Sequence, residues 1–421
     1  MRHRSRCCLV MAAGVATSSA SHAHAHVKWF SPYDLSGPPQ QIERVFDYNF
    51  DLLCALSILL LVLGCAIESR APGRALLRGI NALTRSIETN SDTLIRGGCG
   101  FFLVALWTLG NIILTPELKT DQAWISWFQL AIAACLLWQA TLVYAAIGLF
   151  TLYAIGMHDY GIFHLLDYPI FIGLALYLFM SGTQKTLFKI RAIDVLRVSV
   201  AITLMWASVE KWAYPQWSYP IIADNPKLTM GFPREFYMQA AGLVEFALSF
   251  AIILGPLVRR AAAAMLLGIF VSAIGPFGKI DAIGHAPIIA VLAVILGDGA
   301  SGRALLSVEI KSIWSFCRGT ALLTCSFGAF LATFIAAYYL LHTELYPNIE
   351  ISLCVCTAHA PDKQSAGASR IKQSHELTAC RVLRETSGER AHFVATSPAE
   401  LRPQPTLCEI DPKGGTDAAP D

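Results

Sequence analysis

Long apolar stretches recur between residue 50 and residue 341, and they restrict the fold of this chain more than any other feature. Hydrophobic residues make up 55% of the sequence and charged residues only 15%, whereas soluble domains carry roughly 25% charged residues. A helix of about 20 apolar residues crosses a bilayer and satisfies its own backbone hydrogen bonds there. The sequence therefore predicts an all-α, polytopic membrane protein, a helical bundle of about ten transmembrane helices.

Run lengths and the polar joints between runs predict the organisation of the chain. We expect a signal peptide (1–25), a periplasmic N-terminal segment (26–49), a first span with a basic cytoplasmic loop (50–96), two four-helix blocks (97–182 and 191–300), a last transmembrane helix (319–342) and a periplasmic, disordered tail (343–421). The predicted spans are residues 50–68, 97–114, 124–138, 141–155, 168–180, 193–212, 236–254, 260–274, 287–296 and 321–341.

The first 25 residues have the parts of a secretory signal peptide. A basic start, MRHRSR, precedes an apolar run, and small residues up to Ala23 or Ala25 fit a cleavage site. The run is shorter than the roughly 20 residues of a spanning helix. This length favours a cleaved signal over the alternative, an uncleaved first helix.

Cleavage would leave histidine at or near the new N-terminus. A chain beginning at His24 carries His26 at its third position, and a chain beginning at His26 starts with histidine itself. The free α-amine and imidazole nitrogens then form a nitrogen-rich site of the kind that suits Cu(II). The alternative is a polar tail that happens to contain histidine.

Basic residues are concentrated on one side of the predicted bundle. The densest loop, residues 70–96, holds five arginines, while the opposite segments hold chiefly Lys119, Lys227, Arg234 and Lys279. This is the positive-inside pattern, and it predicts a bacterial inner-membrane protein with a periplasmic mature N-terminus and tail. Within the basic loop, apolar residues at helical spacing predict an amphipathic helix on the cytoplasmic leaflet. The apolar spans indicate the lipid bilayer as a partner, and the net charge of +2 is too small to imply a nucleic-acid partner.

The tail is polar and contains four cysteines, Cys354, Cys356, Cys380 and Cys408. An even number of cysteines in an oxidising compartment predicts disulfides, but four cysteines allow three pairings. Alternatively, Cys354 and Cys356 with His359 could hold a soft metal ion.

The two four-helix blocks share a pattern that indicates an internal repeat. Four spans per block is an even number, so the copies should have the same orientation, as in a parallel repeat. The paired segments are 134–150 with 251–270, 167–170 with 285–288, and Ile95-Arg96 with Leu196-Arg197.

Several residues of the second block carry a further resemblance: Leu196-Arg197, Glu210-Lys211, residues 241–245 and the turn at 254–262. With these residues the block resembles the DoxX-like family of small four-helix membrane proteins. The resemblance implies a helical bundle, sometimes linked to thiosulfate:quinone oxidoreduction or to redox partner proteins, although fold transfers more safely than chemistry. The first block has Gly110-Asn111 and Gln129 at the corresponding places, which indicates that it has lost the charged centre.

Three charged residues in apolar runs are the candidate catalytic residues: Glu210, Lys211 and Glu245. A carboxylate inside a membrane helix is costly unless it is paired or protonated, so Glu245 is a functional-site hypothesis. Lys211 could pair with Glu245 or with Glu210. The alternative is that Lys211 extends to the interface and Glu210 is simply exposed.

A second group of candidates is expected at the periplasmic face. His285 and Asp167 begin corresponding spans, and His158, Asp159 and His164 precede Asp167 in an outer loop. With His24 and His26 they could bind copper or another divalent metal, or relay protons for a quinone. The alternative is ordinary hydrogen bonding by interfacial histidines.

Three functions remain open from the sequence. The first is a component of a periplasm-facing redox or quinone-linked system, with a periplasmic or membrane redox partner. The second is a membrane protein that handles copper or another divalent metal, and the third is a structural partner subunit without chemistry of its own. Phosphate-binding glycine loops, nucleophile elbows and CxxCH haem motifs do not occur, but whether the protein is an enzyme stays open.

Overall fold

A computed structural model of the chain describes residues 27–184, 190–299, 304, 312–347, 380–383, 392–395 and 407–408. The chain forms two units, Met1–His342 and Thr343–Asp421. The predicted signal peptide, with His24 and His26, lies outside the described residues, as do Cys354, Cys356 and His359.

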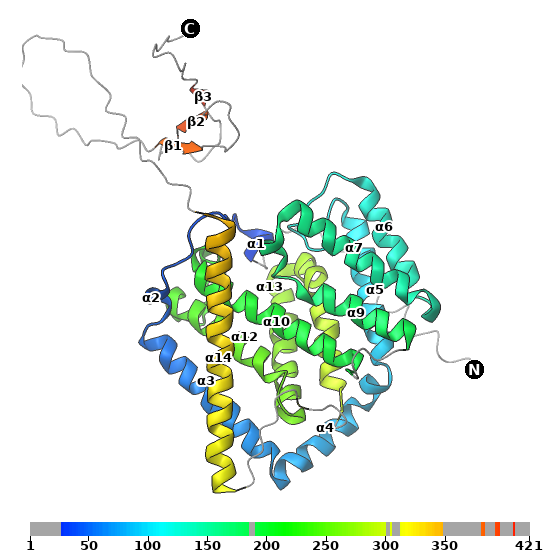
Figure 1. The fold of residues 1–421 in the computed structure, drawn as a ribbon, viewed down its shortest axis with the longest axis vertical. Coiled ribbons are helices and arrows are strands. Elements are labelled where there is room, and N and C mark those ends of the chain that lie inside the picture. The colour runs from blue at the N-terminus through cyan, green and yellow to red at the C-terminus, as the bar shows by residue number, and fades with distance from the viewer. Residues whose placement is uncertain are drawn as a thin grey trace, which may run out of the picture. The chain divides into compact units, whose positions relative to one another are not determined.

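The first unit is a bundle of helices (Figure 1). Its longer helices are α3 (Tyr48–Glu68), α4 (Ala71–Thr89), α5 (Ser91–Leu109), α6 (Ala123–Cys135), α7 (Leu142–Tyr160), α9 (Pro169–Thr183), α10 (Ala192–Ala213), α12 (Arg234–Ala251), α13 (Pro256–Gly297) and α14 (Ile313–Leu345). Short helices complete it: α1 (Val27–Phe30), α2 (Ile42–Val45), α8 (Ile162–Leu165), α11 (Tyr219–Asp224), η1 (Gln139–Thr141), η3 (Pro215–Trp217) and η4 (Pro226–Thr229).

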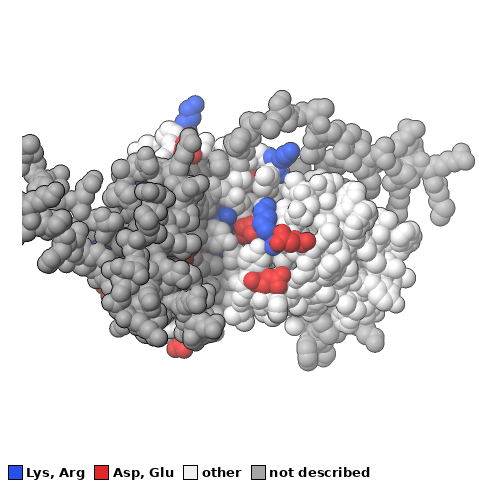
Figure 2. Space-filling model, turned by 90° about the horizontal axis from the view of Figure 1, so that it is seen from above, with Lys and Arg blue, Asp and Glu red and all other residues white. Residues whose placement is uncertain are grey.

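Six helical segments of the described chain are long and apolar enough to cross a membrane: α3, α5, η1 with α7, α10, α13 and α14. Helices α6 and α9 are apolar but shorter. Large apolar side chains such as Leu52, Leu59 and Leu60 of α3 are exposed, which suits contact with lipid tails. Figure 2 shows one face of the molecule, where the visible Lys, Arg, Asp and Glu side chains gather mainly near the middle among uncharged residues. The predicted all-α, polytopic membrane fold is confirmed for this unit, whereas the number of ten crossings stays a prediction.

Helix α13 reverses direction at Gly278, where φ is 75° and ψ is −158°. A straight helix of its 42 residues would be about 63 Å long. Instead its two ends meet: Nη2 of Arg259 lies 3.1 Å from the Asp298 carboxylate, and Nη2 of Arg260 donates to the Gly297 carbonyl at 3.1 Å. The reversal falls between the spans predicted at 260–274 and 287–296, and glycine tolerates the positive φ without strain.

The span predicted at 97–114 runs past the end of the helix found there. Helix α5 ends at Leu109, because Gly110 and Asn111 both have positive φ angles, 69° and 54°. The chain then forms a tight loop closed by a bridge between Ile112 and Lys119. Residues 110–114 therefore lie in a loop.

The two predicted blocks are packed against each other through their terminal helices. Helix α9 packs on α10, and α5 packs on α13. Small residues permit these contacts, since a Cβ atom at Gly173 would collide with the side chain of Ser199, and one at Gly98 would meet Ala290. The first helix of each block thus contacts the last helix of the other.

The predicted amphipathic helix is found as α4. Its half-buried residues Leu77, Ile80 and Ile87 are interleaved with Leu76 and Leu83, which are exposed. Helix α4 contacts α3 and α13, so it has both a packed face and an open apolar face. That it lies on the cytoplasmic leaflet stays a prediction.

The second unit contains three short strands, where the sequence analysis predicted disorder. Strands β1 (Cys380–Leu383), β2 (His392–Ala395) and β3 (Leu407–Cys408) form an antiparallel sheet in the order β1-β2-β3. Cys380 is opposite Ala395, and Phe393 is opposite Cys408. For the rest of the tail, which lies outside the described residues, disorder stays a prediction.

Candidate functional site

A cavity of about 470 Å³ lies among α9, α10, α12 and α13 of the first unit. Most of its lining is apolar or aromatic and includes Phe171, Leu204, Phe236, Leu266 and Phe270. Its Asp, Glu, Lys and His lining residues are Asp167, Glu210, Lys211, Glu245, Asp281 and His285. Five of these six are the residues that the sequence analysis selected, and the structure brings them to one cavity.

Lys211 and Glu245 form an ion pair on the wall of this cavity. Lys211 is in the last turn of α10, and its Nζ lies 2.7 Å from Oε2 of Glu245 on α12. Their side chains are 27% and 16% exposed, so the pair is accessible from the cavity. The sequence left Glu245 and Glu210 as possible partners of Lys211, and in the structure its partner is Glu245.

Glu210 pairs instead with Lys28, a residue that the sequence analysis did not select. Nζ of Lys28 lies 2.5 Å from Oε2 of Glu210 and also donates to Asp167. The side chains of Lys28 and Glu210 are 1% and 9% exposed, so Glu210 is not a simply exposed residue. Burial alone would lower the pKa of Lys28, but the carboxylates of Asp167 and Glu210 outweigh it and raise this pKa above its ordinary value.

Aromatic rings complete the surroundings of Lys28. Its Nζ is 5.8 Å from the ring centroid of Tyr33 and 5.7 Å from that of Trp217. Trp217 is stacked on Tyr214 with centroids 4.0 Å apart. The aromatic segment after α10 therefore supplies one of the faces around the ammonium group.

His285 is held by Asp281, one helical turn earlier on α13. Nδ1 of His285 lies 2.8 Å from Oδ1 of Asp281, which is fully buried. The imidazole lies between Trp29 and Phe270, each with its ring centroid 4.8 Å away. A buried carboxylate that orients an imidazole is a common arrangement for proton transfer. The i, i+4 spacing of Asp281 and His285 was the available sequence signal.

The other predicted periplasmic residues do not join this group. His158 is exposed and pairs with Asp159 at 2.8 Å. His164 is buried, and its Nε2 lies 3.7 Å from Oε1 of Glu117, which also accepts from the hydroxyl of Tyr168.

The described residues contain no group of three or more His, Cys, Asp and Glu side chains arranged to hold a metal ion. Asp167 and His285 line the same cavity, but each is paired within the protein, with Lys28 and Asp281 respectively. A metal site built on His24 and His26 stays a prediction, because both lie outside the described residues.

The first block has neutral contacts where the second has the ion pair. Nε2 of Gln129 donates to the carbonyls of Ile112 and Ile113 at 2.7 and 2.8 Å. Gln129 is on the second helix of its block and reaches the loop after the first, whereas Glu245 reaches Lys211 in the last turn of the first helix of its block. Each contact therefore joins the second helix of its block to the region where the first helix ends.

Two arginines also occupy corresponding places. Arg96 donates to the carbonyl of Leu136 at 2.7 Å, and Arg197 donates to that of Ile252 at 3.1 Å. Each arginine is the sixth residue of the first helix of its block and binds the end of the second, and each has an aspartate partner in its own helix. These contacts favour the predicted repeat.

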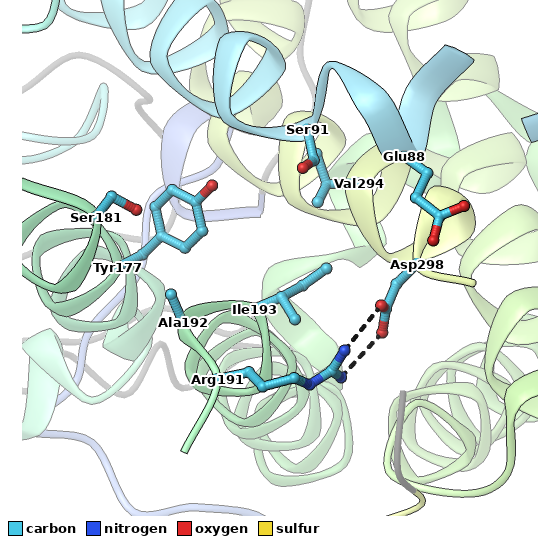
Figure 3. Close-up of a pocket in the computed structure, with 9 residues that line it drawn as sticks. All are labelled: Glu88, Ser91, Tyr177, Ser181, Arg191, Ala192, Ile193, Val294 and Asp298. Atoms are coloured by element: carbon cyan, nitrogen blue, oxygen red, sulfur yellow. Dashed lines mark hydrogen bonds and ion pairs between the residues drawn. The ribbon is translucent and has the colours of Figure 1, made fainter. Parts of the chain in front are cut away.

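A smaller pocket of about 270 Å³ is lined by the start of α10 and the end of α13, with Glu88, Tyr177 and Ser181 (Figure 3). Arg191 lies at one side of it, with Nη1 and Nη2 at 3.2 and 3.3 Å from the Asp298 carboxylate. Asp298 also accepts from the buried Arg259. Because Arg191 and Asp298 bind each other, we infer that the ion pairs at this pocket hold the start of α10 to the end of α13.

Comparison with known proteins gives one match. Residues 192–279 match the DoxX family model, and this range covers α10, α12 and α13 as far as the reversal. No curated protein and no solved structure shows a significant match to the chain. The chain therefore contains a DoxX domain, in the block that carries the resemblance. Glu210, Lys211 and Glu245 lie within it, whereas Lys28 and His285 lie outside it.

Proposed function

We propose that this multi-pass membrane protein, with its DoxX domain at residues 192–279, binds a quinone in the cavity and is a component of a redox system at the periplasmic face of the bacterial inner membrane. One observation carries the proposal: a cavity of about 470 Å³ combines a largely apolar lining with five charged side chains and a histidine. Such cavities suit a lipophilic ligand with a polar head.

The lining offers contacts for the ring of a quinone, for its carbonyl oxygens and for the protons taken up on its reduction. Aromatic residues such as Phe171 and Phe236 offer surfaces for a flat ring. Lys211 carries donors for a carbonyl oxygen, and the pair of His285 with Asp281 can deliver or accept a proton. A bound quinone takes up two electrons and two protons on full reduction, and here the electrons would come from a redox partner protein.

The orientation of the bundle supports a periplasmic site. Arg74, Arg78 and Arg85 are exposed on α4, and α4 contacts the start of α13 through Arg260, which donates to Asn81. We infer that this end faces the cytoplasm, following the positive-inside rule. Lys28 and its neighbours on the N-terminal segment then lie towards the periplasm, as expected if a signal peptide precedes them.

Analysis of the purified protein tests the proposal. We expect quinone in an organic extract of the detergent-solubilised protein, and we expect decylubiquinone to quench tryptophan fluorescence, because Trp29 and Trp217 line the cavity. Glu245→Gln and Lys211→Met should weaken this binding at least tenfold, whereas Glu235→Gln, at an exposed carboxylate, should not.

Other results would favour the remaining hypotheses. Stoichiometric copper without quinone would overturn the proposal in favour of metal handling. Neither quinone nor copper, with no fluorescence response to decylubiquinone, would leave a structural partner subunit. Equal binding by all variants would show that the quinone lies elsewhere on the protein.

A further inference from the structure

The ammonium group of Lys28 is bound by residues from two separate parts of the bundle. Asp167 lies two residues before α9, and Glu210 is near the end of α10. Lys28 itself belongs to α1, a helix of four residues in the N-terminal segment. The two carboxylates are therefore brought together by the packing of α9 on α10, and Lys28 reaches them from a third segment.

The surroundings are selective for a primary ammonium group. Two buried carboxylates side by side repel each other unless a cation lies between them. An ammonium has three donors, and Lys28 directs them to Asp167 and Glu210 with Tyr33 and Trp217 at cation–π distance. Oδ1 of Asp167 is buried and has no hydrogen-bond partner among the described residues, so the site offers a further acceptor.

The cavity continues from this site and carries an excess of negative charge. Asp167 and Glu210 line both, together with Glu245 and Asp281. These four carboxylates face two lysines, Lys28 and Lys211, and His285. Even with a protonated histidine the group has one negative charge more than positive ones, which favours a cationic ligand with an apolar body.

Helix α1 closes the cavity at the same place. Trp29, next to Lys28, lines the cavity and lies so close to Gly284 that a Cβ atom there would collide with the indole ring. The residues that follow are fixed, since Tyr214 donates to the carbonyl of Gly37 at 2.9 Å and the amide of Gln40 donates to that of Ala213 at 2.7 Å. Lys28 and Trp29 are neighbours on α1, so withdrawal of this short helix would open the ammonium site and the apolar cavity together.

We propose that Asp167, Glu210, Tyr33 and Trp217 form a binding site for a primary ammonium group, that Lys28 fills this site in the resting protein, and that a lipophilic primary amine binds there when Lys28 is withdrawn. The amine head takes the place of the Lys28 ammonium, and its hydrocarbon chain extends into the apolar cavity. This inference goes beyond the proposed function and does not depend on quinone binding.

Chemical replacement of the lysine tests the proposal on the full chain in detergent. We expect Lys28→Ala to unfold at a lower temperature than the wild type, and n-hexylamine to restore at least half of the loss over a concentration series. Hexanol, which has the chain without the charge, and tetramethylammonium, which lacks N–H donors, should not restore it. The wild type should not respond to hexylamine, because Lys28 occupies the site.

A variant without the carboxylates provides the specificity control. Lys28→Ala combined with Asp167→Asn and Glu210→Gln should show no response to hexylamine. The proposal is overturned if hexylamine and hexanol act equally, if the wild type is stabilised as much as Lys28→Ala, or if a folded Lys28→Ala variant is not stabilised at all.

If Lys28→Ala does not fold, the triple variant Lys28→Met with Asp167→Asn and Glu210→Gln tests whether the three residues are needed for their charges or for packing. The proposal expects this variant to fold, because no uncompensated carboxylate remains, and to ignore hexylamine. A triple variant that also fails to fold would overturn the proposal, since the residues would then be needed for packing and not for their charges.

Discussion

Lys28 and Glu210 form a buried ion pair between the N-terminal segment and the DoxX domain, with Nζ 2.5 Å from Oε2. Removing one partner of a buried pair leaves an uncompensated charge and typically costs about 3–5 kcal/mol. We therefore expect Lys28→Met to lower the free energy of unfolding by several kcal/mol, measured by chemical denaturation in detergent. The matched control is Arg234→Met, which breaks an exposed pair with Glu235 and should have no measurable effect. Equal stability of both variants would contradict the prediction.

Alkaline pH should destabilise the protein through the same site. The pKa of Lys28 is raised above its ordinary value of 10.5, since its two carboxylates outweigh burial, and burial, with the negative charge of Glu117, raises the pKa of Tyr33 from 10.0 to about 12. For a raised pKa the stabilisation is complete below the unfolded-state value and is lost as the pH rises towards the folded-state value.

The melting temperature should therefore lose little from these two groups up to about pH 9 and fall above about pH 10. Lys28→Met and Tyr33→Phe should each show a shallower alkaline decline than the wild type, in melting curves recorded from pH 7 to pH 12 by circular dichroism. A decline that is just as steep in the combined variant would assign it to other groups.

The pair of Lys211 with Glu245 should be coupled, but only moderately. Because their side chains are 27% and 16% exposed, solvent screening limits the coupling energy in a double-mutant cycle of Lys211→Met and Glu245→Gln to about 1 kcal/mol. The effect on decylubiquinone binding should be larger than the effect on stability, because both side chains line the cavity. A variant that loses stability and keeps its affinity would indicate a purely structural pair.

The charged residues within apolar runs could be predicted from the sequence, and their partners only in part. Glu210, Lys211 and Glu245 are conspicuous because charges are costly inside a membrane. Lys28 lies in a polar segment where a lysine is ordinary, and nothing local connects it to Glu210. Asp281 lies between two predicted spans, where the sequence predicts a loop. In the structure α13 reverses direction at Gly278, and Asp281 is buried in the helical segment that follows.

The positions of the helices were predictable because apolar run length determines them, while their ends depended on local backbone geometry. Gly110 and Asn111 end α5 early through positive φ angles, which these two residue types tolerate. The apolar residues 112–114 follow them, so hydropathy alone extends the predicted span past this point. The assembly of the cavity depended on packing of α9 against α10. Neither hydropathy nor spacing contains that information.

The difference between the two blocks gives the last prediction. Gln129 is fully buried, and its Nε2 donates to the carbonyls of Ile112 and Ile113. Glutamate at this position would direct a carboxylate at two carbonyl oxygens and leave both without a donor, which costs about 1–3 kcal/mol for each unsatisfied group. We expect Gln129→Glu to lower the unfolding temperature strongly, whereas Glu245→Gln, which keeps polar atoms beside Lys211, should lower it little. If both substitutions were equally mild, the first block would tolerate a charged centre, and its neutral contacts would not explain why the cavity residues belong mainly to the second block.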